Sequence, residues 1–367
     1  MNVAIVCDWL TNVGGAEKVL LAVHRLYPEA PIYTSKYSPK GIDWFKDADV
    51  RTGWLQIFPA ACRRFLGPLR QRWFSRLDLS EYDLVISVTG AEAKAVKVPN
   101  GVHISYCHVP TQYYWQMYDD YVRDPGFGVL NPVVRMCFKA LVKPMRKADF
   151  AAAQGVDQFV TISEYAKSLI YKYYKREAIV VHPPVEVEEF REYCKGSKRK
   201  DDGYYIVTSR QVTWKRLDLA VKACLETGSR LMVVGEGPEH KRLVKMAEGS
   251  QAIEFLPLSG REALAGYLRQ AKGYLFPSLE PFGIAPVEAL ACGCPVIAYG
   301  EGGAKDYVVD GLNGILFKKQ TVKALVDAMG KFEKMKFDTV KVVKTSEEFS
   351  VKRFNAEMRE VVNEKCR

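Results

Sequence analysis

The sequence lacks several features that mark other classes of protein. No run of its 367 residues approaches the ~18 to 20 consecutive apolar residues that a membrane span requires. The first residues, MNVAIVCD, lack the basic start and the small-residue cleavage site of a signal peptide, so we do not expect secretion. The nine cysteines form no CxxC pair, which argues against a disulfide framework and a zinc site. These absences favour a cytoplasmic protein with reduced thiols.

Motifs for two common nucleotide-binding classes and for a metal site are also missing. The first glycine-rich loop, residues 12–17, has neither the GxGxxG pattern of a dinucleotide fold nor the GxxxxGK(S/T) pattern of a P-loop. This argues against a nicotinamide-dependent enzyme and against an ATPase. The single D-x-D sequence, Asp47-Ala-Asp49, follows Trp44-Phe45-Lys46 instead of ending an apolar strand. We therefore expect no catalytic metal.

What is present is the composition of a globular α/β protein. Hydrophobic residues make up 48% and charged residues 26% of the chain, and at roughly 150 residues per domain its length corresponds to two domains. Short apolar runs alternate with helical patterns, which predicts two doubly wound domains with parallel sheets. The predicted strands are residues 3–7, 84–88, 102–106, 158–162, 178–181, 204–208, 230–234, 252–255, 273–276 and 295–298.

The domain boundaries follow from local composition. A charged, apolar-poor stretch over residues 186–203 predicts a linker. We therefore expect a first domain over residues 1–185 and a second over residues 204–345. Residues 346–367 have apolar side chains at helical spacing and predict a terminal helix that packs back toward the first domain.

Ligands of parallel sheets bind where strands end and helices begin, because helix amino termini carry unpaired N–H groups and a partial positive charge. The strongest such cluster follows the predicted strand 273–276. Glu280 lies in a Gly/Pro loop and Glu288 in the helix eight positions later, and between them come the backbone N–H groups of Phe282, Gly283, Ile284 and Ala285. Two carboxylates beside a helix start suit a ligand with an anion and several hydroxyls.

Cations and an imidazole follow other strands. Arg210 ends the strand 204–208 and Lys215 opens the next helix, so both can contact a phosphate. Of the five histidines, only His108 directly follows a strand and precedes a Pro-aromatic loop. Gly14 and Gly15 follow the first strand, where they let the backbone approach a phosphate closely; by themselves they equally fit a simple tight turn.

The block from Phe276 to Ala298 resembles the E-x7-E signature of retaining glycosyltransferase family 4. Other segments also resemble that family: Gly14-Gly15-Ala-Glu17, Thr161-Ile-Ser-Glu164, Pro183-Pro184-Val185, Arg210 with Lys215, Val233-Val-Gly235-Glu-Gly237-Pro238 and Gly302-Gly303-Ala-Lys-Asp306. The resemblance runs from about residue 3 to residue 317. It implies the α/β GT-B fold, with two facing Rossmann-like doubly wound domains and a deep interdomain cleft. The subgroup most resembled is that of bacterial O-antigen and exopolysaccharide mannosyltransferases.

The resemblance implies a reaction and a role for each site residue. The enzyme would move mannose from GDP-mannose to a lipid-linked or oligosaccharide acceptor, without a metal or other cofactor. Arg210, Lys215 and the Gly14-Gly15 loop would bind the diphosphate, and Glu288 the ribose. Glu280 and the N–H groups of residues 282–285 would bind the donor sugar, which His108 also contacts. Residues 106–115 resemble the subgroup's H-T-P-x-R-Y-x-W segment and place Gln112, Tyr113 and Trp115 on the acceptor side, with Gln112 where an arginine is usual.

Six arginines and no lysine or acid occur between Arg51 and Arg76. Apolar residues recur near helical spacing in the same segment, which predicts a basic amphipathic patch over residues 51–76. We expect this patch to bind an anionic membrane, which would place the enzyme at the inner face of the cytoplasmic membrane. An ordinary helix facing the domain core is the second interpretation. Nucleic acid is not expected as a partner, because no base-stacking module or recognition helix accompanies the charge.

Three alternative functions stay open at this stage. The chain could be a family 4 transferase that uses a UDP-sugar, a non-catalytic subunit that binds a sugar nucleotide or glycan, or a nucleotide-sugar epimerase of similar architecture. The presence of both Glu280 and Glu288 favours a transferase.

Overall fold

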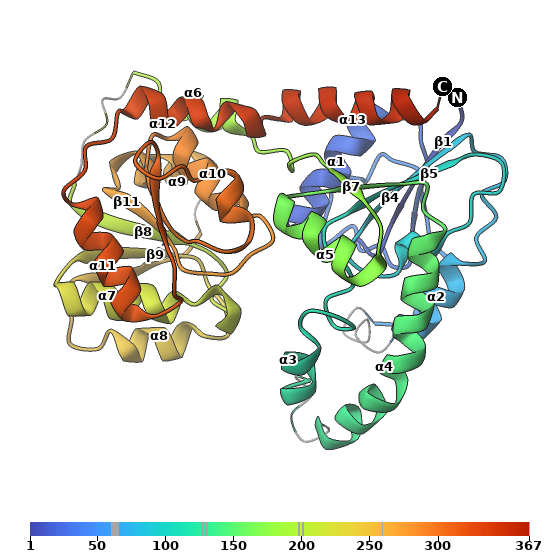
Figure 1. Ribbon diagram of the computed structural model, residues 1–367, viewed down its shortest axis with the longest axis horizontal. Coiled ribbons are helices and arrows are strands. Elements are labelled where there is room, and N and C mark those ends of the chain that lie inside the picture. The colour runs from blue at the N-terminus through green and yellow to red at the C-terminus, as the bar shows by residue number, and fades with distance from the viewer. Residues whose placement is uncertain are drawn as a thin grey trace. The chain divides into compact units, whose positions relative to one another are not determined.

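The apolar runs of the sequence form the parallel strands of two sheets, each in its own unit. The computed structural model describes residues 1–59, 66–125, 128, 131–196, 199, 202–258 and 260–366. Unit 1 consists of Met1–Pro183 and Phe354–Arg367, and unit 2 of Pro184–Arg353 (Figure 1). No helix within the described ranges is both long and apolar enough to cross a membrane.

Unit 1 contains a parallel sheet with the strand order β3-β2-β1-β4-β5-β6-β7. The strand order reverses between β1 and β4, which defines the switch point of the sheet. The strands are β1 (Val3–Cys7), β2 (Ile32–Thr34), β3 (Val50–Arg51), β4 (Leu84–Thr89), β5 (Val102–Cys107), β6 (Gln158–Thr161) and β7 (Ala178–Val180). The helices are α1 (Gly15–Leu26), α2 (Gly67–Phe74), α3 (Tyr118–Arg123), α4 (Asn131–Gln154), α5 (Glu164–Tyr174) and the greater part of α13 (Val351–Lys365), with short 3-10 helices η1 (Trp54–Ile57) and η3 (Ala93–Ala95).

Unit 2 repeats this plan with the strand order β10-β9-β8-β11-β12-β13, which is the 3-2-1-4-5-6 order of the Rossmann fold. The strands are β8 (Tyr204–Thr208), β9 (Arg230–Val234), β10 (Ile253–Leu256), β11 (Gly273–Phe276), β12 (Val296–Tyr299) and β13 (Gly314–Phe317). The helices are α6 (Val187–Tyr193), α7 (Leu217–Thr227), α8 (His240–Met246), α9 (Arg261–Gln270), α10 (Ile284–Ala291), α11 (Val322–Phe332) and α12 (Thr339–Thr345), with η5 (Thr213–Lys215), η6 (Gly302–Asp306) and η7 (Glu347–Phe349).

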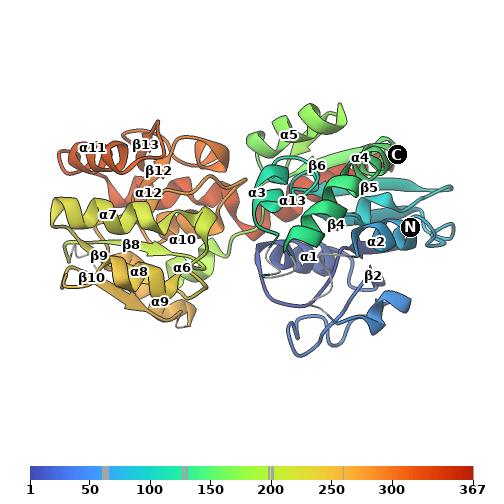
Figure 2. The ribbon, with the colours of Figure 1, turned by 90° about the horizontal axis from the view of Figure 1, so that it is seen from below.

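Helices cover both faces of the second sheet. Helix α7 packs with α8 and α11, whereas α10 packs with α6, α9 and α12. Figure 2 shows α7 and α8 in front of this sheet. The strands between these layers are buried on both sides, as all five residues of β8 and all four of β11 illustrate. The predicted fold of two doubly wound parallel-sheet domains is present in the structure.

The stretch 186–203 differs from the expected linker. Residues 187–193 form helix α6, whose Val187 and Phe190 are buried in unit 2. Its charged residues lie on the outer face, where Glu189 pairs with Arg261 and Arg191 pairs with Glu347 at 2.8 Å. In the first part of the predicted linker, the charges therefore lie on the exposed side of a packed helix, whereas the charged residues from 195 on follow the helix and lie partly outside the described residues.

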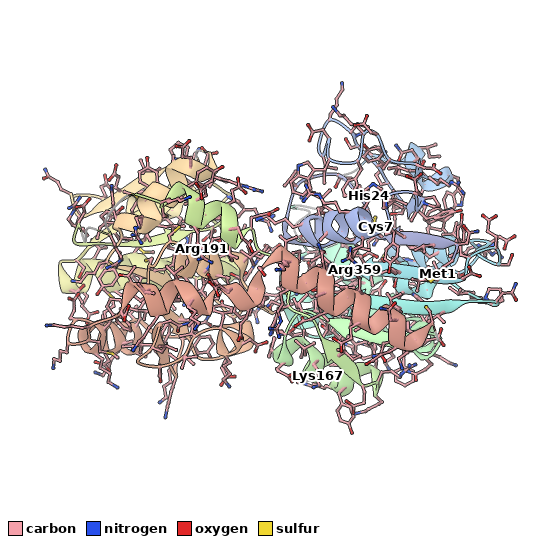
Figure 3. The ribbon with its side chains drawn as sticks, turned by 90° about the horizontal axis from the view of Figure 1, so that it is seen from above. Met1, Cys7, His24, Lys167, Arg191 and Arg359 are labelled. Carbon is pink, nitrogen blue, oxygen red and sulfur yellow. The ribbon has the colours of Figure 1, made fainter. Side chains whose placement is uncertain are left out.

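The predicted terminal helix is α13, and its residues from Phe354 on belong to unit 1. Phe354, Met358, Val361 and Val362 are buried, and the ring of Phe354 meets that of Tyr106 edge-on at 5.8 Å. Arg359 lies on the exposed side of the helix (Figure 3). The helical spacing of apolar residues therefore marks the packed face correctly.

Candidate functional site

The donor-site residues predicted in the second half of the chain lie at the switch point of the second sheet, between strands β8 and β11. The loop after β8 carries Arg210 and Lys215, and the loop after β11 carries Glu280. Because β8 and β11 are adjacent parallel strands, their carboxyl ends bring these two loops together. Ligands of open α/β sheets bind at this position.

Lys215 and Glu280 form an ion pair across the switch point. The distance from Lys215 Nζ to Glu280 Oε2 is 2.5 Å, and Ser278 Oγ donates to Glu280 Oε1 at 2.8 Å. The side chains of Lys215 and Glu280 are 19% and 16% exposed. The pair is thus sheltered yet accessible, and a cation and a carboxylate are available side by side to one ligand.

Glycine at position 283 shapes the loop that leads into helix α10. Gly283 has a φ of +98°, and a Cβ there would lie 2.6 Å from the ring of Phe276. Tyr307 donates from its hydroxyl to the carbonyl of Phe282 at 3.0 Å, and the buried Phe282 ring packs on Tyr307. The chain therefore enters α10 in one conformation, and the first N–H groups of a helix have no partner within that helix. This arrangement can bind an anion or polar hydroxyls.

A pair of glycines, Gly302 and Gly303, contacts the same loop. Gly303 donates its N–H to the carbonyl of Glu280 at 2.8 Å. A Cβ at Gly302 would lie 2.4 Å from that carbonyl oxygen, and one at Gly303 would lie 2.4 Å from Phe282 Cα. Close backbone approach therefore explains the Gly302-Gly303 motif, which helps to position Glu280.

The loop after β8 is held in a similar way by the loop after β9. Gly235 and Gly237 have positive φ angles, and a Cβ on them would lie 2.3 Å from Ser209 O and 2.4 Å from Gln211 O. Gln211 is fully buried, and its N–H donates to Glu236 O at 2.8 Å. The sequence analysis did not predict a role for Gln211 in shaping this loop, although its position between Arg210 and Lys215 was an available signal. The neighbouring Arg210 is exposed, so its guanidinium is open to a ligand.

Glu288 lies in the second turn of α10 and is buried at 8% exposure. The charges of both carboxylates act on the hydroxyl of the buried Tyr274. Burial, with smaller contributions from Glu280 and Glu288, raises the pKa of Tyr274 above its ordinary value. Both acids therefore influence one buried tyrosine, Glu280 from the loop and Glu288 from just over one turn into the helix.

In unit 1, the predicted glycine loop follows β1. Helix α1 begins at Gly15, with Gly14 as its extended N-cap residue. A Cβ on Gly14 would lie 2.8 Å from Glu17 Oε2, which is the end of a flexible side chain. The loop thus has a helix start at a strand end, and its role toward a phosphate stays a prediction.

His108 directly follows β5, as predicted. Its N–H donates to Thr89 O at 2.8 Å, and its ring meets that of Tyr106 edge-on at 5.6 Å. Burial lowers the pKa of His108 to about 4, so the imidazole is neutral near pH 7. Its Nε2 is buried and has no hydrogen-bond partner among the residues that the structure describes. A neutral imidazole with an unused nitrogen can exchange a hydrogen bond with a ligand.

The segment after His108 is anchored by a buried ion pair that the sequence did not reveal. Lys94 Nζ lies 2.6 Å from Asp149 Oδ1, and both side chains are 1% exposed. Thr111 Oγ1, Trp115 Nε1 and the Tyr174 hydroxyl donate to the same carboxylate at 2.7–2.9 Å. Although burial lowers the pKa of Lys94, the Asp149 carboxylate raises it above the ordinary lysine value. Five polar groups thus hold residues 111–115 against α4.

Two of the predicted acceptor-side residues use their polar atoms within unit 1. Trp115 donates its indole N–H to Asp149, and Tyr113 donates its hydroxyl to Glu92 Oε1 at 2.5 Å. These bonds stabilise the fold of unit 1, and the acceptor-side role of both residues stays a prediction. Gln112 is partly exposed and keeps its predicted role as a hypothesis.

The segment 51–76, predicted as a membrane patch, has both buried and exposed residues. Arg70 is buried and bonds Glu92 Oε2 at 2.8 Å, and Trp73 and Phe74 are core residues. Arg51 bonds Asp49 Oδ2 at 2.9 Å. Arg63 and Arg64 lie outside the described residues. Other residues of the described part are exposed: Trp54, Ile57 and Leu69 at 48%, 78% and 38%, and also Arg72 and Arg76. The buried residues fit the second interpretation made above, and the membrane patch stays a prediction for the exposed ones.

Asp8, directly after β1, has a structural role that the sequence analysis overlooked. Its carboxylate accepts hydrogen bonds from Thr89 Oγ1 and from the N–H groups of Gly90, Ala91 and Ala93, at 2.8–3.0 Å. It thereby ties β1 to β4 at the switch point of the first sheet. Its location directly after an apolar strand was the available signal.

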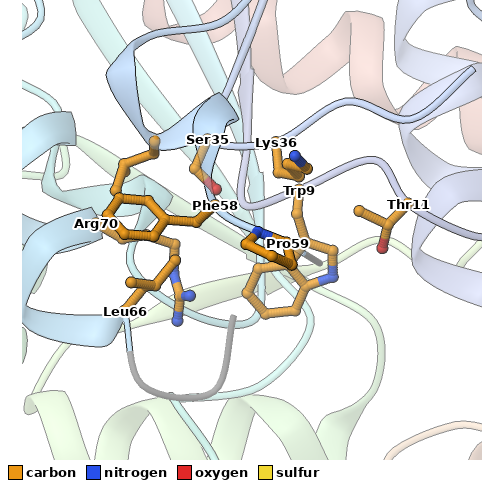
Figure 4. Close-up of a pocket in the computed structure, with 9 residues that line it drawn as sticks. Trp9, Thr11, Ser35, Lys36, Phe58, Pro59, Leu66 and Arg70 are labelled. Atoms are coloured by element: carbon orange, nitrogen blue, oxygen red, sulfur yellow. The ribbon is translucent and has the colours of Figure 1, made fainter. Parts of the chain in front are cut away.

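A shallow pocket lies near the ends of β1 and β2, and nine side chains line it (Figure 4). Trp9 and Phe58 give it aromatic surface, and the Arg70 guanidinium lies 5.0 Å from the centre of the Trp9 ring.

Within the described ranges, no three His, Cys, Asp or Glu side chains are grouped so as to hold a metal ion.

Comparisons with known proteins add family information to this geometry. Residues 189–349 match the sequence profile of the family "Glycosyl transferases group 1". An uncharacterized glycosyltransferase of Methanocaldococcus jannaschii is 28% identical over 171 residues, or 46% of this chain and 47% of that protein. The D-inositol 3-phosphate glycosyltransferase of Mycolicibacterium smegmatis is 32% identical over 154 residues, or 37% of this chain and 35% of that protein. The alignments thus span less than half the length of these relatives.

Solved structures resemble the chain over nearly its whole length. Anabaena HepE in complex with UDP has a TM-score of 0.72 at 17% identity and covers 99% of this chain and 100% of its own. The lipopolysaccharide outer core galactosyltransferase WaaB has a TM-score of 0.73 at 15% identity, with both chains fully covered. These likenesses confirm the predicted GT-B fold class with two Rossmann-like domains. The residues that match the group 1 family profile, 189–349, all lie in unit 2.

Proposed function

We propose that this protein is a retaining, metal-independent glycosyltransferase that moves a hexose from a nucleoside diphosphate sugar to a hydroxyl of a lipid-linked or polysaccharide acceptor. The observation that carries this proposal is the Lys215–Glu280 ion pair at 2.5 Å at the switch point of the second sheet. The region that matches the group 1 family includes both residues.

Each part of the donor has a matching group in unit 2. The leaving diphosphate gathers negative charge in the transition state, and Lys215 and the exposed Arg210 would stabilise it. Glu280 and the N–H groups of residues 282–285 would bind the sugar hydroxyls, because a carboxylate accepts hydrogen bonds from hydroxyls and a backbone N–H donates hydrogen bonds to them. Glu288 would bind the ribose hydroxyls. In a retaining reaction of this kind, the acceptor proton passes to the departing phosphate, so no protein base is required.

The donor is proposed to be GDP-mannose, on the resemblance to the mannosyltransferase subgroup. A UDP-sugar is the second candidate. HepE was solved with UDP and with UDP-glucose, and WaaB is described as a galactosyltransferase. A thermal-shift screen of GDP-mannose, UDP-glucose and UDP-galactose distinguishes these donors. The larger stabilisation identifies the nucleotide, because a ligand that binds only the folded state raises its melting temperature.

The transferase class is tested by the release of nucleoside diphosphate. A panel of octyl glycosides can serve as acceptors, with each donor in turn. Release that requires an acceptor supports a transferase, and proton NMR of the product's anomeric centre reports whether the configuration is retained. Tight donor binding with no acceptor-dependent release would instead indicate a non-catalytic binding subunit. Conversion of the donor sugar without an acceptor would indicate an epimerase.

The roles predicted for Gly14, Gly15, His108 and Gln112 in unit 1 belong to the same proposal. Substitution of His108 by alanine is the most direct test of them, because its buried Nε2 is unused within the described protein. Peripheral association with the inner face of the cytoplasmic membrane is also part of the proposal, since the enzyme must reach a lipid-linked acceptor.

A further inference from the structure

Helix α4 of unit 1 has a composition that its packing does not explain. It spans Asn131–Gln154, which at 1.5 Å per residue is about 36 Å. Its first 18 residues include five basic side chains and no acid: Arg135, Lys139, Lys143, Arg146 and Lys147. Figure 1 shows that the first half of α4 extends beyond the sheet of unit 1, with α3 beside it.

One face of α4 is packed in the ordinary way. Val142 and Met145 are buried against Tyr114, with Phe138, Trp115 and Tyr118 beside them. Arg135 donates to the carbonyls of Val122 and Arg123, and Arg146 donates to that of Tyr114 at 2.5 Å. These contacts use two of the five cations and hold the helix in one rotational setting about its axis.

The opposite face is apolar and exposed. Val133, Met136 and Leu141 are 57%, 65% and 49% exposed, and Cys137 is exposed between them. Lys139, Lys143 and Lys147 are exposed along one edge of this face at a spacing of four residues. A helix with apolar residues on two faces normally buries both. No described part of the chain therefore covers this second face to the extent that its composition suits.

We propose that this face, which we call the α4 apolar stripe, docks on an anionic lipid bilayer. Helices that lie in the membrane interface combine exposed apolar side chains with a basic edge, and lysines near an anionic surface are attracted to it. The absence of acids from residues 131–148 makes the charge complementary over the whole length of the stripe. Nucleic acid would match the charge but not the apolar side chains at its centre. The surface is a different one from the predicted 51–76 segment, and it does not depend on the transferase reaction.

The first experiment compares three matched double charge reversals by co-sedimentation with vesicles. Vesicles of phosphatidylcholine alone are compared with vesicles containing phosphatidylglycerol, at low and high salt. Lys139→Glu with Lys143→Glu tests α4, and Arg72→Glu with Arg76→Glu tests the segment predicted from the sequence. Lys241→Glu with Lys245→Glu on α8 is the control, because these two lysines are also exposed, four residues apart, and flank the exposed Val244.

We expect the full-length protein to bind the anionic vesicles, and salt to release it. The α4 variant should lose about tenfold or more in partition coefficient, whereas the other two variants keep wild-type binding. Circular dichroism and the melting temperature establish that each variant is folded. Equal losses in all three variants would mean that net charge alone acts and would overturn the proposal. So would a loss confined to the Arg72 and Arg76 variant, or a wild type that ignores lipid charge.

The second experiment tests whether the apolar stripe enters the bilayer. Cys137 lies on the stripe, so an environment-sensitive fluorophore attached there reports insertion, once Cys62 and Cys366 are replaced by serine. We expect a blue shift with anionic vesicles only, and its loss on Met136→Ser with Leu141→Ser, which leaves every charge in place. An unchanged emission spectrum in a protein that sediments with vesicles would overturn the assignment of this face. Emission that shifts with another protein but not with vesicles would indicate a protein partner instead and would also overturn it.

Discussion

Replacement of Glu280 by glutamine is the sharpest test of the candidate donor site, because the structure shows how many lone pairs of the carboxylate are not used by the protein. A carboxylate has about four lone-pair positions. One oxygen of Glu280 receives Lys215 Nζ and the other receives Ser278 Oγ. About two positions therefore remain for donor hydroxyls. Glutamine removes the charge and turns one of these acceptors into a donor.

The expected loss in turnover follows from this count. Hydrogen bonds to a charged group contribute about 1.5–3 kcal/mol each, so the loss of one and the weakening of another costs about 3 kcal/mol and lowers kcat by about 10²-fold. The cost to stability should be about 1 kcal/mol or less, because the lost ion pair is near the surface and not in the core. Lys215 is then free of its counter-charge, so the affinity for the nucleoside diphosphate should stay equal or rise.

The assay measures kcat by acceptor-dependent release of nucleoside diphosphate, Kd by calorimetry and folding by thermal denaturation. Glu333→Gln is the matched control, since Glu333 pairs with Lys272 at the opposite ends of the strands. A folded Glu280→Gln protein with kcat within about threefold of wild type, a difference below 1 kcal/mol, would falsify the assigned role. An equal loss in the Glu333→Gln control would attribute the effect to the fold instead.

Four further outcomes are expected. Arg210→Ala and Lys215→Ala should each weaken nucleoside diphosphate binding and also lower kcat, because the charge they meet grows in the transition state; unchanged Kd in both would remove them from the site. Activity should persist in excess EDTA, and a strict need for added Mg²⁺ or Mn²⁺ would contradict the charge assignment. Asp149→Asn should destabilise unit 1 by about 3–5 kcal/mol in urea denaturation, since it leaves Lys94 buried without a counter-charge, whereas Asp327→Asn, which breaks an exposed pair with Lys323, should cost under about 0.5 kcal/mol. Burial lowers the pKa of His103 to about 4, below the unfolded value of about 6.5. The unfolded chain therefore binds more protons between these two values, and the free energy of unfolding should fall as the pH drops from about 6.5 to about 4. Denaturation midpoints at several pH values check this, and His103→Asn should make the fall with pH smaller.

The alternation of apolar runs and helical patterns predicted the architecture well. The cores of the strands β1, β4, β5, β8, β9 and β11 lie where the sequence predicts them, because strands buried on both faces read as continuous apolar runs. The predictions missed β2, β3 and β13. β2 and β3 are only three and two residues long, and strands this short form no pattern of their own. They exist because a neighbouring strand offers hydrogen bonds.

The placement of the candidate donor-site residues in unit 2 could also be predicted from the sequence, because their positions are tied to local structure. Glu280, Gly283 and Glu288 follow one strand in order, and Arg210 and Lys215 follow another. Adjacent strand ends bring such loops together in any sheet with this strand order. The sequence could not show that Lys215, and not Arg210, meets Glu280, since that depends on the side-chain packing of two loops 65 residues apart.

The charges of unit 1 show what only the tertiary structure decided. In the sequence, Arg70 belongs to a run of surface-like arginines and Lys94 stands alone. In the structure both are buried, because Glu92 and Asp149 lie within hydrogen-bonding distance of them. Conversely, α4 keeps four large apolar side chains exposed to solvent: Val133, Met136, Leu141 and Phe150. A local pattern predicts which face of a segment is apolar. Whether that face is covered, and whether a buried cation finds a counter-charge, depends on contacts between residues far apart in the chain.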